Sequence, residues 1–255
     1  MCGIVGYTGS QPAQEIVLES LKKLEYRGYD SSGIATHEGK LIICKKEGPI
    51  ENMEAELTKS ESTLAIAHTR WATHGAPSDA NAHPHSDEEA SVAVVHNGTI
   101  DNYLEIKESL EAEGHNFRSN SDSEILPLLI SKYYSGNLVE AVNKTLNDIH
   151  GIFTLAAIHK DNPDEIVAVR NETPLVVGIG NSENFVSSDI YAILKYTQEI
   201  VYPEDYQIVR VTSDKVEVLD RDLNLLDYNV ETVEKYTEVA EKGGFEHFML
   251  KEIFE

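Results

Sequence analysis

The chain has 255 residues and carries 21 Lys and Arg against 44 Asp and Glu, which gives a formal net charge of −23. A charge of this sign repels nucleic acid and anionic membrane surfaces, so we expect neither as a partner. Its two cysteines cannot build a disulfide framework, its start lacks the features of an export signal, and its apolar stretches are far shorter than the ~18 residues of a membrane span, so a cytoplasmic protein is expected.

The second residue of the chain is Cys2, directly before an apolar run at residues 3–7 that predicts a buried strand. If Met1 is removed, Cys2 carries both a thiol, with a reference pKa near ~8.5, and a free α-amine, with a reference pKa near ~7.7–8.0. The amine can then accept the proton of the thiol, and the activated sulfur can attack a carbonyl carbon. The alternative is that position 2 simply holds a small residue, because a single cysteine specifies little.

Hydrophobic periodicity predicts four helices and a larger number of strands. The helices are expected at residues 12–24, 102–113, 121–136 and 138–148, the third of them capped by Ser121 or Asp122. After the first strand, further strands are expected at residues 33–36, 40–45, 64–69, 92–95, 153–159, 166–170, 175–179, 206–212 and 215–219. Because the strands come in groups and do not alternate with helices, the pattern favours an α+β fold with mostly antiparallel sheets and helices packed outside.

Polar, glycine-rich segments end several of these elements, where functional loops are commonly mounted. The first lies at residues 25–33 and contains Arg27; it also fits an ordinary helix C-terminus with basic residues and a glycine. The second, at residues 67–75, contains Arg70 and Trp71, the only tryptophan. The planar fork of Arg70 suits a carboxylate and Trp71 offers a rigid cover, so the pair suits a small zwitterion. The alternative is a surface ion pair beside a core tryptophan.

Two further segments contain candidate polar groups. At residues 96–98, the side-chain amide of Asn97 and the backbone N–H of Gly98 can converge on one oxygen, as the oxyanion of a tetrahedral intermediate requires. The same two residues also suit a hairpin turn. At residues 119–124, Asp122 can pair with a substrate ammonium or act as a helix N-cap, and these roles are not exclusive.

Ten histidines invite a metal interpretation, above all the pair His83 and His85. Their spacing matches no helical zinc pattern, and no phosphate-binding or dinucleotide-binding glycine loop is present, since residues 177–180 fit a turn. We therefore expect no metal and no cofactor.

Taken together, these segments resemble the glutaminase domain of the glucosamine-6-phosphate synthase family. The resemblance follows the order of the chain and rests on residues 2–6, 26–31, 68–75, 81–85 and 96–98. The Cys-Gly-Ile start is shared by all N-terminal-nucleophile amidotransferases. The Tyr-Arg-Gly-Tyr-Asp-Ser and Thr-Arg-Trp-Ala-Thr-His-Gly motifs point to this member rather than to amidophosphoribosyltransferase or asparagine synthetase.

The resemblance implies the N-terminal-nucleophile hydrolase fold, a four-layer αββα sandwich, and hydrolysis of L-glutamine to glutamate and ammonia. Residues 247–253 resemble the segment that leads to the sugar-isomerase half, which is absent here, so residues 1–255 are expected to form one glutamine amidotransferase type 2 domain. In the full-length enzyme, expected to be a homo-oligomer, the ammonia would convert fructose 6-phosphate to glucosamine 6-phosphate in the missing half.

The resemblance also assigns roles to nine residues. Cys2 would be the nucleophile with its α-amine as base, and Asn97 and Gly98 would form the oxyanion hole. The residues placed around the substrate are Arg70 at its α-carboxylate, Asp122 at its α-amine, Thr73 and His74 in the pocket wall, Trp71 at the ammonia passage and Arg27 beside the nucleophile.

Some positions depart from the family wording, such as Ser32 in place of an expected alanine, and these concern pocket tuning more than chemistry. Two alternatives stay open. The chain can be the glutaminase half of another amidotransferase, of the amidophosphoribosyltransferase or asparagine synthetase type, or a non-catalytic glutamine sensor.

Overall fold

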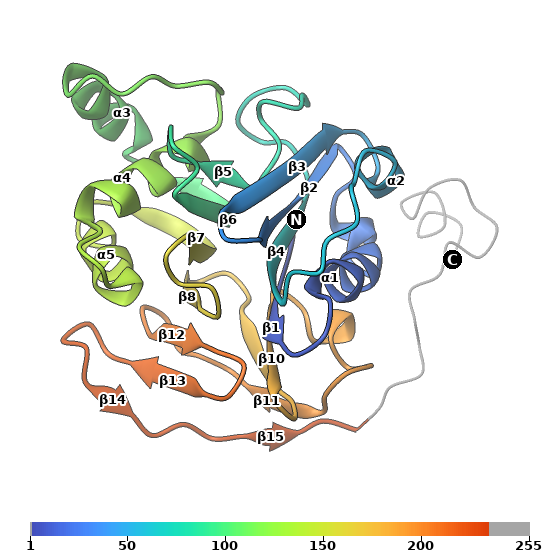
Figure 1. Ribbon diagram of the computed structural model, residues 1–255. Helices are drawn as coiled ribbons and strands as arrows, with labels where there is room; N and C mark the ends of the chain where they lie inside the picture. The colour runs from blue at the N-terminus through green and yellow to red at the C-terminus, as the bar shows by residue number, and fades with distance from the viewer. Residues whose placement is uncertain (1, 235–255) are drawn as a thin grey trace, which may run out of the picture.

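The computed structural model describes residues 2–234, which form two antiparallel sheets packed face to face with helices outside (Figure 1). Met1, whose removal the proposed chemistry needs, and the segment 247–253 lie outside the described residues.

The first sheet has eight strands, and Cys2 directly precedes its central strand β1. In spatial order the strands are β15 (Glu231–Thr232), β11 (Glu199–Val201), β9 (Val176–Ile179), β10 (Glu183–Ser187), β1 (Gly3–Gly9), β4 (Leu64–Arg70), β2 (Ser31–His37) and β3 (Leu41–Glu47).

The second sheet has seven strands, with β6 near one edge. In spatial order they are β14 (Leu225–Leu226), β13 (Val216–Leu219), β12 (Ile208–Val211), β8 (Ile166–Asn171), β7 (Gly151–His159), β6 (Val92–Ile100) and β5 (His85–Ser86).

The helices cover the two outer faces. On the first sheet lie α1 (Ala13–Lys22) and α2 (Ile50–Glu54), and on the second lie α3 (Tyr103–Ala112), α4 (Ile125–Tyr133) and α5 (Leu138–Thr145). Three short 3-10 helices complete the described part: η1 (Glu25–Arg27), η2 (Asp122–Glu124) and η3 (Ile190–Ala192).

Side chains on the strands alternate between the core shared by the sheets and the cores under the helices. In β1, Ile4 belongs to the core between the sheets, whereas Val5 packs toward α1. In β6, Val95 faces the first sheet and Val94 faces the helices on the second. The period of two thus separates three apolar layers, and the expected four-layer αββα sandwich is confirmed.

The same alternation brings polar residues from several strands to one end of the core. Every second side chain of a strand lies on the same face, so residues an even number of positions from a core residue also point between the sheets. Ile4, Ile66 and Val95 belong to that core. The polar residues on the same face are Cys2, His68, Arg70 and Asn97. Because β1 and β4 pair in a register that sets Ile4 opposite His68, Cys2 continues that register toward Arg70.

The structure corrects several local expectations. Residues 96–98 lie inside β6 and pair with β7, so the hairpin-turn alternative is wrong. Residues 177–179 belong to β9 rather than to a turn. The helix expected at 121–136 is divided into η2 and α4, and Ser121, not Asp122, is the N-cap, because its side chain accepts a hydrogen bond from the Ser123 N–H. Pro127 is tolerated in the first turn of α4, where its missing N–H would have no helical partner.

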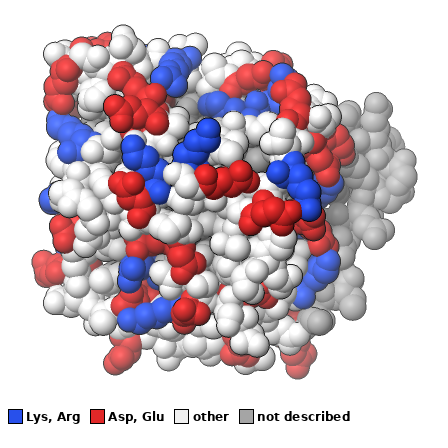
Figure 2. Space-filling view, in the orientation of Figure 1, with Lys and Arg blue, Asp and Glu red and all other residues white. Residues whose placement is uncertain are grey.

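Charged side chains of both signs are interspersed over the face shown in Figure 2. Ion pairs link charged side chains of the described residues, such as Lys22 with Glu54 and Lys195 with Glu19. None of the helices between residues 2 and 234 has the length and apolar character needed to cross a bilayer.

Candidate active site

The Cys2 thiol is held by the backbone that follows β4. The Trp71 N–H donates a hydrogen bond to Sγ at 3.2 Å, and Sγ lies 3.5 Å from the Trp71 carbonyl oxygen, so the thiol hydrogen can point there. Burial raises the pKa of the thiol. The sulfur therefore stays protonated at neutral pH, and a base must remove its proton before it can attack.

The side-chain amide of Asn97 faces the same residue from the second sheet. Its Nδ2 donates to the Cys2 carbonyl oxygen at 3.2 Å, while its Oδ1 lies 3.0 Å from Nε2 of His68. The amide nitrogen is thus directed at the nucleophile end of β1, where an oxyanion formed by attack of Sγ would need a donor.

Gly98 has a backbone that only glycine adopts without strain at this place. Its φ is +110°, and it pairs with Phe153 in the β6–β7 ladder. A Cβ here would collide with the carbonyl oxygen of Ile152 on the neighbouring strand. The glycine therefore allows the backbone of β7 to approach β6 closely beside Asn97.

A Gly98→Ala substitution should lower the free energy of unfolding by about 1–3 kcal/mol from backbone strain alone, and by more if the collision with Ile152 displaces β7. Chemical denaturation measures the loss. Gly114→Ala is the matched control, since its φ is also positive, at +100°, and a Cβ there meets nothing within 4 Å. Equal losses for the two variants would contradict the special constraint at Gly98.

Arg70 is a buried cation with an unused donor. It is 4% exposed, and its Nη2 donates to the carbonyl oxygens of His74 and Gly75. Its Nη1 is buried without a hydrogen-bond partner among the described residues, and no carboxylate there forms an ion pair with it. The surface ion pair considered from the sequence is therefore wrong. Burial lowers the pKa of Arg70, but an arginine side chain remains charged in a protein. The buried guanidinium is therefore suited to bind an anionic group of a ligand.

Asp122 supplies a buried negative charge near that cation. It is 3% exposed and its Oδ2 accepts the Ile100 N–H at 2.9 Å, which fixes the carboxylate at the end of β6. Its charge counters the depression of the Arg70 pKa, so the two groups are within electrostatic range. A fixed carboxylate and a fixed guanidinium near one nucleophile suit a substrate with both an ammonium and a carboxylate.

The loop after β4 carries the remaining predicted pocket residues. Trp71 is 37% exposed and packs edge to face on Tyr29 with ring centroids 6.0 Å apart, so the core-tryptophan alternative is wrong. Thr73 is exposed, and His74 is half-buried with its ring 5.6 Å from that of Tyr103. Because Arg70 binds the His74 carbonyl, the same guanidinium that is open to an anion also shapes this loop.

Arg27 stands apart from the other predicted residues. Its Nη2 forms an ion pair with Asp189 at 2.5 Å, and its Nε donates to the Tyr26 hydroxyl at 3.1 Å. The following residue, Gly28, packs against the backbone of Arg70 and Trp71, where a Cβ would not fit. The bonds of Arg27 to Tyr26 and Asp189 thus hold the segment whose Gly28 lies against the Trp71 backbone.

Sequence reasoning assigned no role to two residues that shape the site. Asp30 accepts the Ala72 N–H at 2.8 Å and so ties the loop after β4 to β2. His68 binds Asn97, as given above, and both residues lay inside quoted motifs. The strand alternation that points His68 between the sheets was the available signal.

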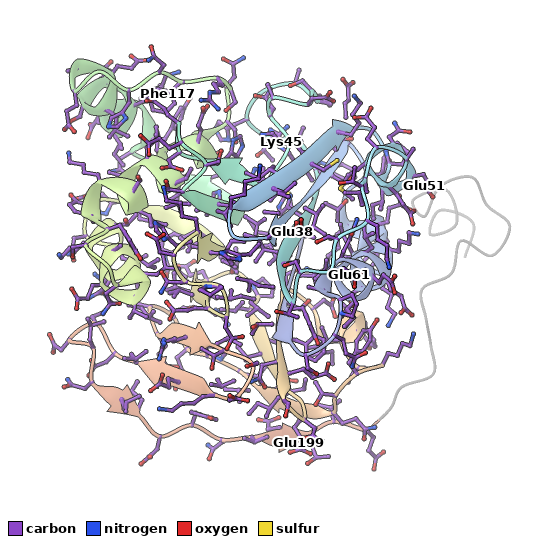
Figure 3. All side chains as sticks on the ribbon, in the orientation of Figure 1. Glu38, Lys45, Glu51, Glu61, Phe117 and Glu199 are labelled. Atoms are coloured by element: carbon purple, nitrogen blue, oxygen red, sulfur yellow. The ribbon has the colours of Figure 1, made fainter. Side chains whose placement is uncertain are left out.

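The buried histidines do not form a metal site. Among residues 2–234 no group of three or more His, Cys, Asp or Glu side chains is arranged to hold a metal ion. The rings instead stack, with those of His68 and His83 4.2 Å apart at 14°. Lys45 on β3, labelled in Figure 3, donates to the Ala82 carbonyl at 2.7 Å and so holds the segment that delivers His83 to this stack.

Comparison with known proteins gives a consistent result. A family model described as glutamine amidotransferase domain matches residues 68–195. The chain is 50% identical over 258 residues to glutamine–fructose-6-phosphate aminotransferase (isomerizing) from Caldanaerobacter subterraneus subsp. tengcongensis, covering 100% of this chain and 42% of that protein. The protein of the same name from Thermus thermophilus is 47% identical over 259 residues, with the same coverage. The chain thus spans less than half the length of these relatives.

A solved structure supports the same assignment. The glutamine phosphoribosylpyrophosphate amidotransferase from B. subtilis matches with a TM-score of 0.74 and 25% sequence identity, covering 88% of this chain and 50% of that one. The fold is thus that of the N-terminal-nucleophile amidotransferases, as expected, and the sequence and structural matches agree. The chain belongs to the glutamine amidotransferase domain family.

Proposed function

We propose that this chain hydrolyses L-glutamine to glutamate and ammonia, with Cys2 as its nucleophile. One observation carries the proposal. The Asn97 amide nitrogen lies 3.2 Å from the Cys2 carbonyl oxygen, at the same end of the core as the buried Nη1 of Arg70, which has no partner among residues 2–234. A nucleophile, an oxyanion donor and an anion receptor at one end of the core are the groups that acyl transfer from a zwitterionic amide needs.

The chemistry starts once Met1 is removed and the α-amine of Cys2 is free. That amine takes the thiol proton, and Sγ attacks the side-chain amide carbon of glutamine. The carbonyl oxygen becomes an oxyanion, which the Asn97 Nδ2–H and the Gly98 N–H stabilise. The protonated amine then donates its proton to the leaving nitrogen, so ammonia departs and a thioester remains. Water, activated by the same amine, cleaves the thioester to give glutamate and the free thiol.

Recognition of glutamine follows from the two buried charges. Arg70 would bind the α-carboxylate through Nη1, which has no partner among residues 2–234. Asp122 would bind the α-ammonium through Oδ1, which otherwise accepts only a long hydrogen bond of 3.4 Å from the Ser123 hydroxyl within the described residues. Thr73 and His74 would line the pocket, Trp71 would border the route by which ammonia leaves, and Arg27 would support the segment beside the nucleophile.

The names of the relatives support a wider role. We propose that residues 1–255 are one glutaminase domain whose ammonia serves conversion of fructose 6-phosphate in a sugar-isomerase half, within a homo-oligomer. Cys2 and Cys44 are free thiols, which supports a cytoplasmic location for the protein. The net charge of −23 supports the expectation that neither nucleic acid nor a membrane is a partner.

The test is a direct assay of the purified chain after intact mass spectrometry has shown that Met1 is absent. Glutamate and ammonia should form from L-glutamine in equal amounts. D-glutamine is the matched control, because it cannot present its ammonium and carboxylate to Asp122 and Arg70 in the same arrangement. Saturable binding of L-glutamine without any turnover would contradict the proposal and leave the sensor alternative.

A further inference from the structure

One hydrogen bond joins the two sheets at the site. His68 lies in β4 of the first sheet and is fully buried, and its Nε2 is 3.0 Å from Oδ1 of Asn97 in β6 of the second. The other end of the Asn97 amide donates to the Cys2 carbonyl at 3.2 Å. The asparagine assigned to the oxyanion hole is therefore held from both sides.

The partners of this amide fix its orientation and the protonation of the histidine. The Cys2 carbonyl can only accept, so the Asn97 atom facing it is the nitrogen, and the atom facing His68 is the oxygen. An amide oxygen also only accepts, so Nε2 of His68 carries a hydrogen. Burial lowers the pKa of His68 to about 3, so the ring is neutral and its Nδ1 has no hydrogen. Nδ1 is then an acceptor, and no donor within residues 2–234 reaches it.

A second imidazole holds the ring in place. His83 stacks on His68 with centroids 4.2 Å apart, and its Nδ1 accepts the backbone N–H of His96 at 3.2 Å. Gly33 in β2 leaves the room that the His83 carbonyl occupies, since a Cβ there would collide with it. His83 thus holds the His68 ring, and His83 is itself hydrogen-bonded to β6, the strand that also carries Asn97.

We propose that His68 is a positioning residue for the oxyanion hole, in that its Nε2–H keeps the Asn97 amide turned with its nitrogen toward the reacting carbonyl. The proposal rests on the glutaminase function proposed above. Without this donor, the amide can rotate about its terminal torsion, and its oxygen would then repel the developing oxyanion. His68 touches no substrate and acts only through Asn97.

Two amide variants separate positioning from bulk structure. In His68→Gln, the side-chain Nε2 can reach the place of the imidazole Nε2 and donate to Asn97. In His68→Asn, the amide nitrogen falls near the place of Nδ1 and cannot reach it. Loss of an oxyanion donor costs about 10²–10³-fold in kcat, so His68→Asn should lose about tenfold or more, up to that limit, with little change in KM. His68→Gln should recover most of the loss.

The matched control is His159→Asn, which makes the same change in another buried histidine, 3% exposed, at the end of β7, where it pairs with Val92 and not with Asn97. Its kcat should stay within about twofold of the parent chain, since no oxyanion donor is disturbed. Rates are expressed per active site, counted by stoichiometric labelling of Cys2 with a diazoketone analogue of glutamine, so partial unfolding of a variant does not count as lost kcat.

Equal kcat values for His68→Asn and His68→Gln would overturn the proposal, as would a loss expressed only in KM. Either result leaves the glutaminase function standing, because that function is judged by turnover of the parent chain. An inactive parent chain would instead refute the proposed function.

Discussion

A Cys2→Ala variant should lose glutaminase activity by about 10⁴-fold or more in kcat, the size of effect seen when the nucleophile of an acyl-transfer enzyme is removed. The α-amine, Asn97 and Gly98 remain, but no atom is left to form the thioester. Glutamine should still bind, because within residues 2–234 the hydrogen bonds of Sγ go to the Trp71 backbone, at 3.2 and 3.5 Å, and not to Arg70 or Asp122. Turnover and calorimetric titration with glutamine measure the two effects separately.

Cys44→Ala is the control for this variant, since Cys44 is the only other cysteine. It lies half-buried in β3, with Sγ 3.9 Å from the Met53 carbonyl and away from the core between the sheets. Its removal should leave turnover unchanged and should leave one thiol for the diazoketone to label. Turnover that survives in Cys2→Ala would mean that another group attacks the amide. Turnover in a chain that retains Met1 would exclude the α-amine as the base.

Most of the sandwich could be predicted from the sequence because its strands are apolar and alternate. The strand β10 was missed because Phe185 and Val186 are its only apolar residues. The strand β10 is stabilised by its pairing with β1, in which Val5 lies opposite Ser187, 182 positions further along the chain. Such pairing stabilises a strand whose own sequence does not favour one. The short α2 was missed for a similar reason, since Ile50 and Met53 are its only buried residues.

The site was predictable as a set of motifs but not as geometry. Asn97 and Gly98 fit a turn when read alone, and only the pairing of β6 with β7 shows that the strand continues through them. The ion pair of Arg27 with Asp189 joins residues 162 positions apart, which no local pattern indicates. The bond between His68 and Asn97 likewise depends on how two sheets face each other.

An Arg70→Met variant should weaken glutamine recognition strongly while leaving the fold intact. The Nη1 of Arg70 has no partner in the described part of the chain, so the α-carboxylate would be its counterion. Losing a charge-assisted hydrogen bond in a buried site costs about 2–5 kcal/mol, which corresponds to a rise in KM of about 30-fold to several thousandfold. The free energy of unfolding should fall little, because no carboxylate among residues 2–234 forms an ion pair with Arg70 and the bonds lost are those to the His74 and Gly75 carbonyls.

Arg27→Met is the matched comparison, because both arginines are largely buried and only one has an acid partner. The Arg27 and Asp189 side chains are 10% and 12% exposed, so removing the cation leaves Asp189 buried and uncompensated. We expect a loss of about 3–5 kcal/mol in the free energy of unfolding, measured by chemical denaturation. Arg70→Met should therefore mainly raise the KM for glutamine, whereas Arg27→Met should mainly lower the free energy of unfolding. A large stability loss in Arg70→Met with an unchanged KM would show that Arg70 holds only the loop after β4, through the His74 and Gly75 carbonyls.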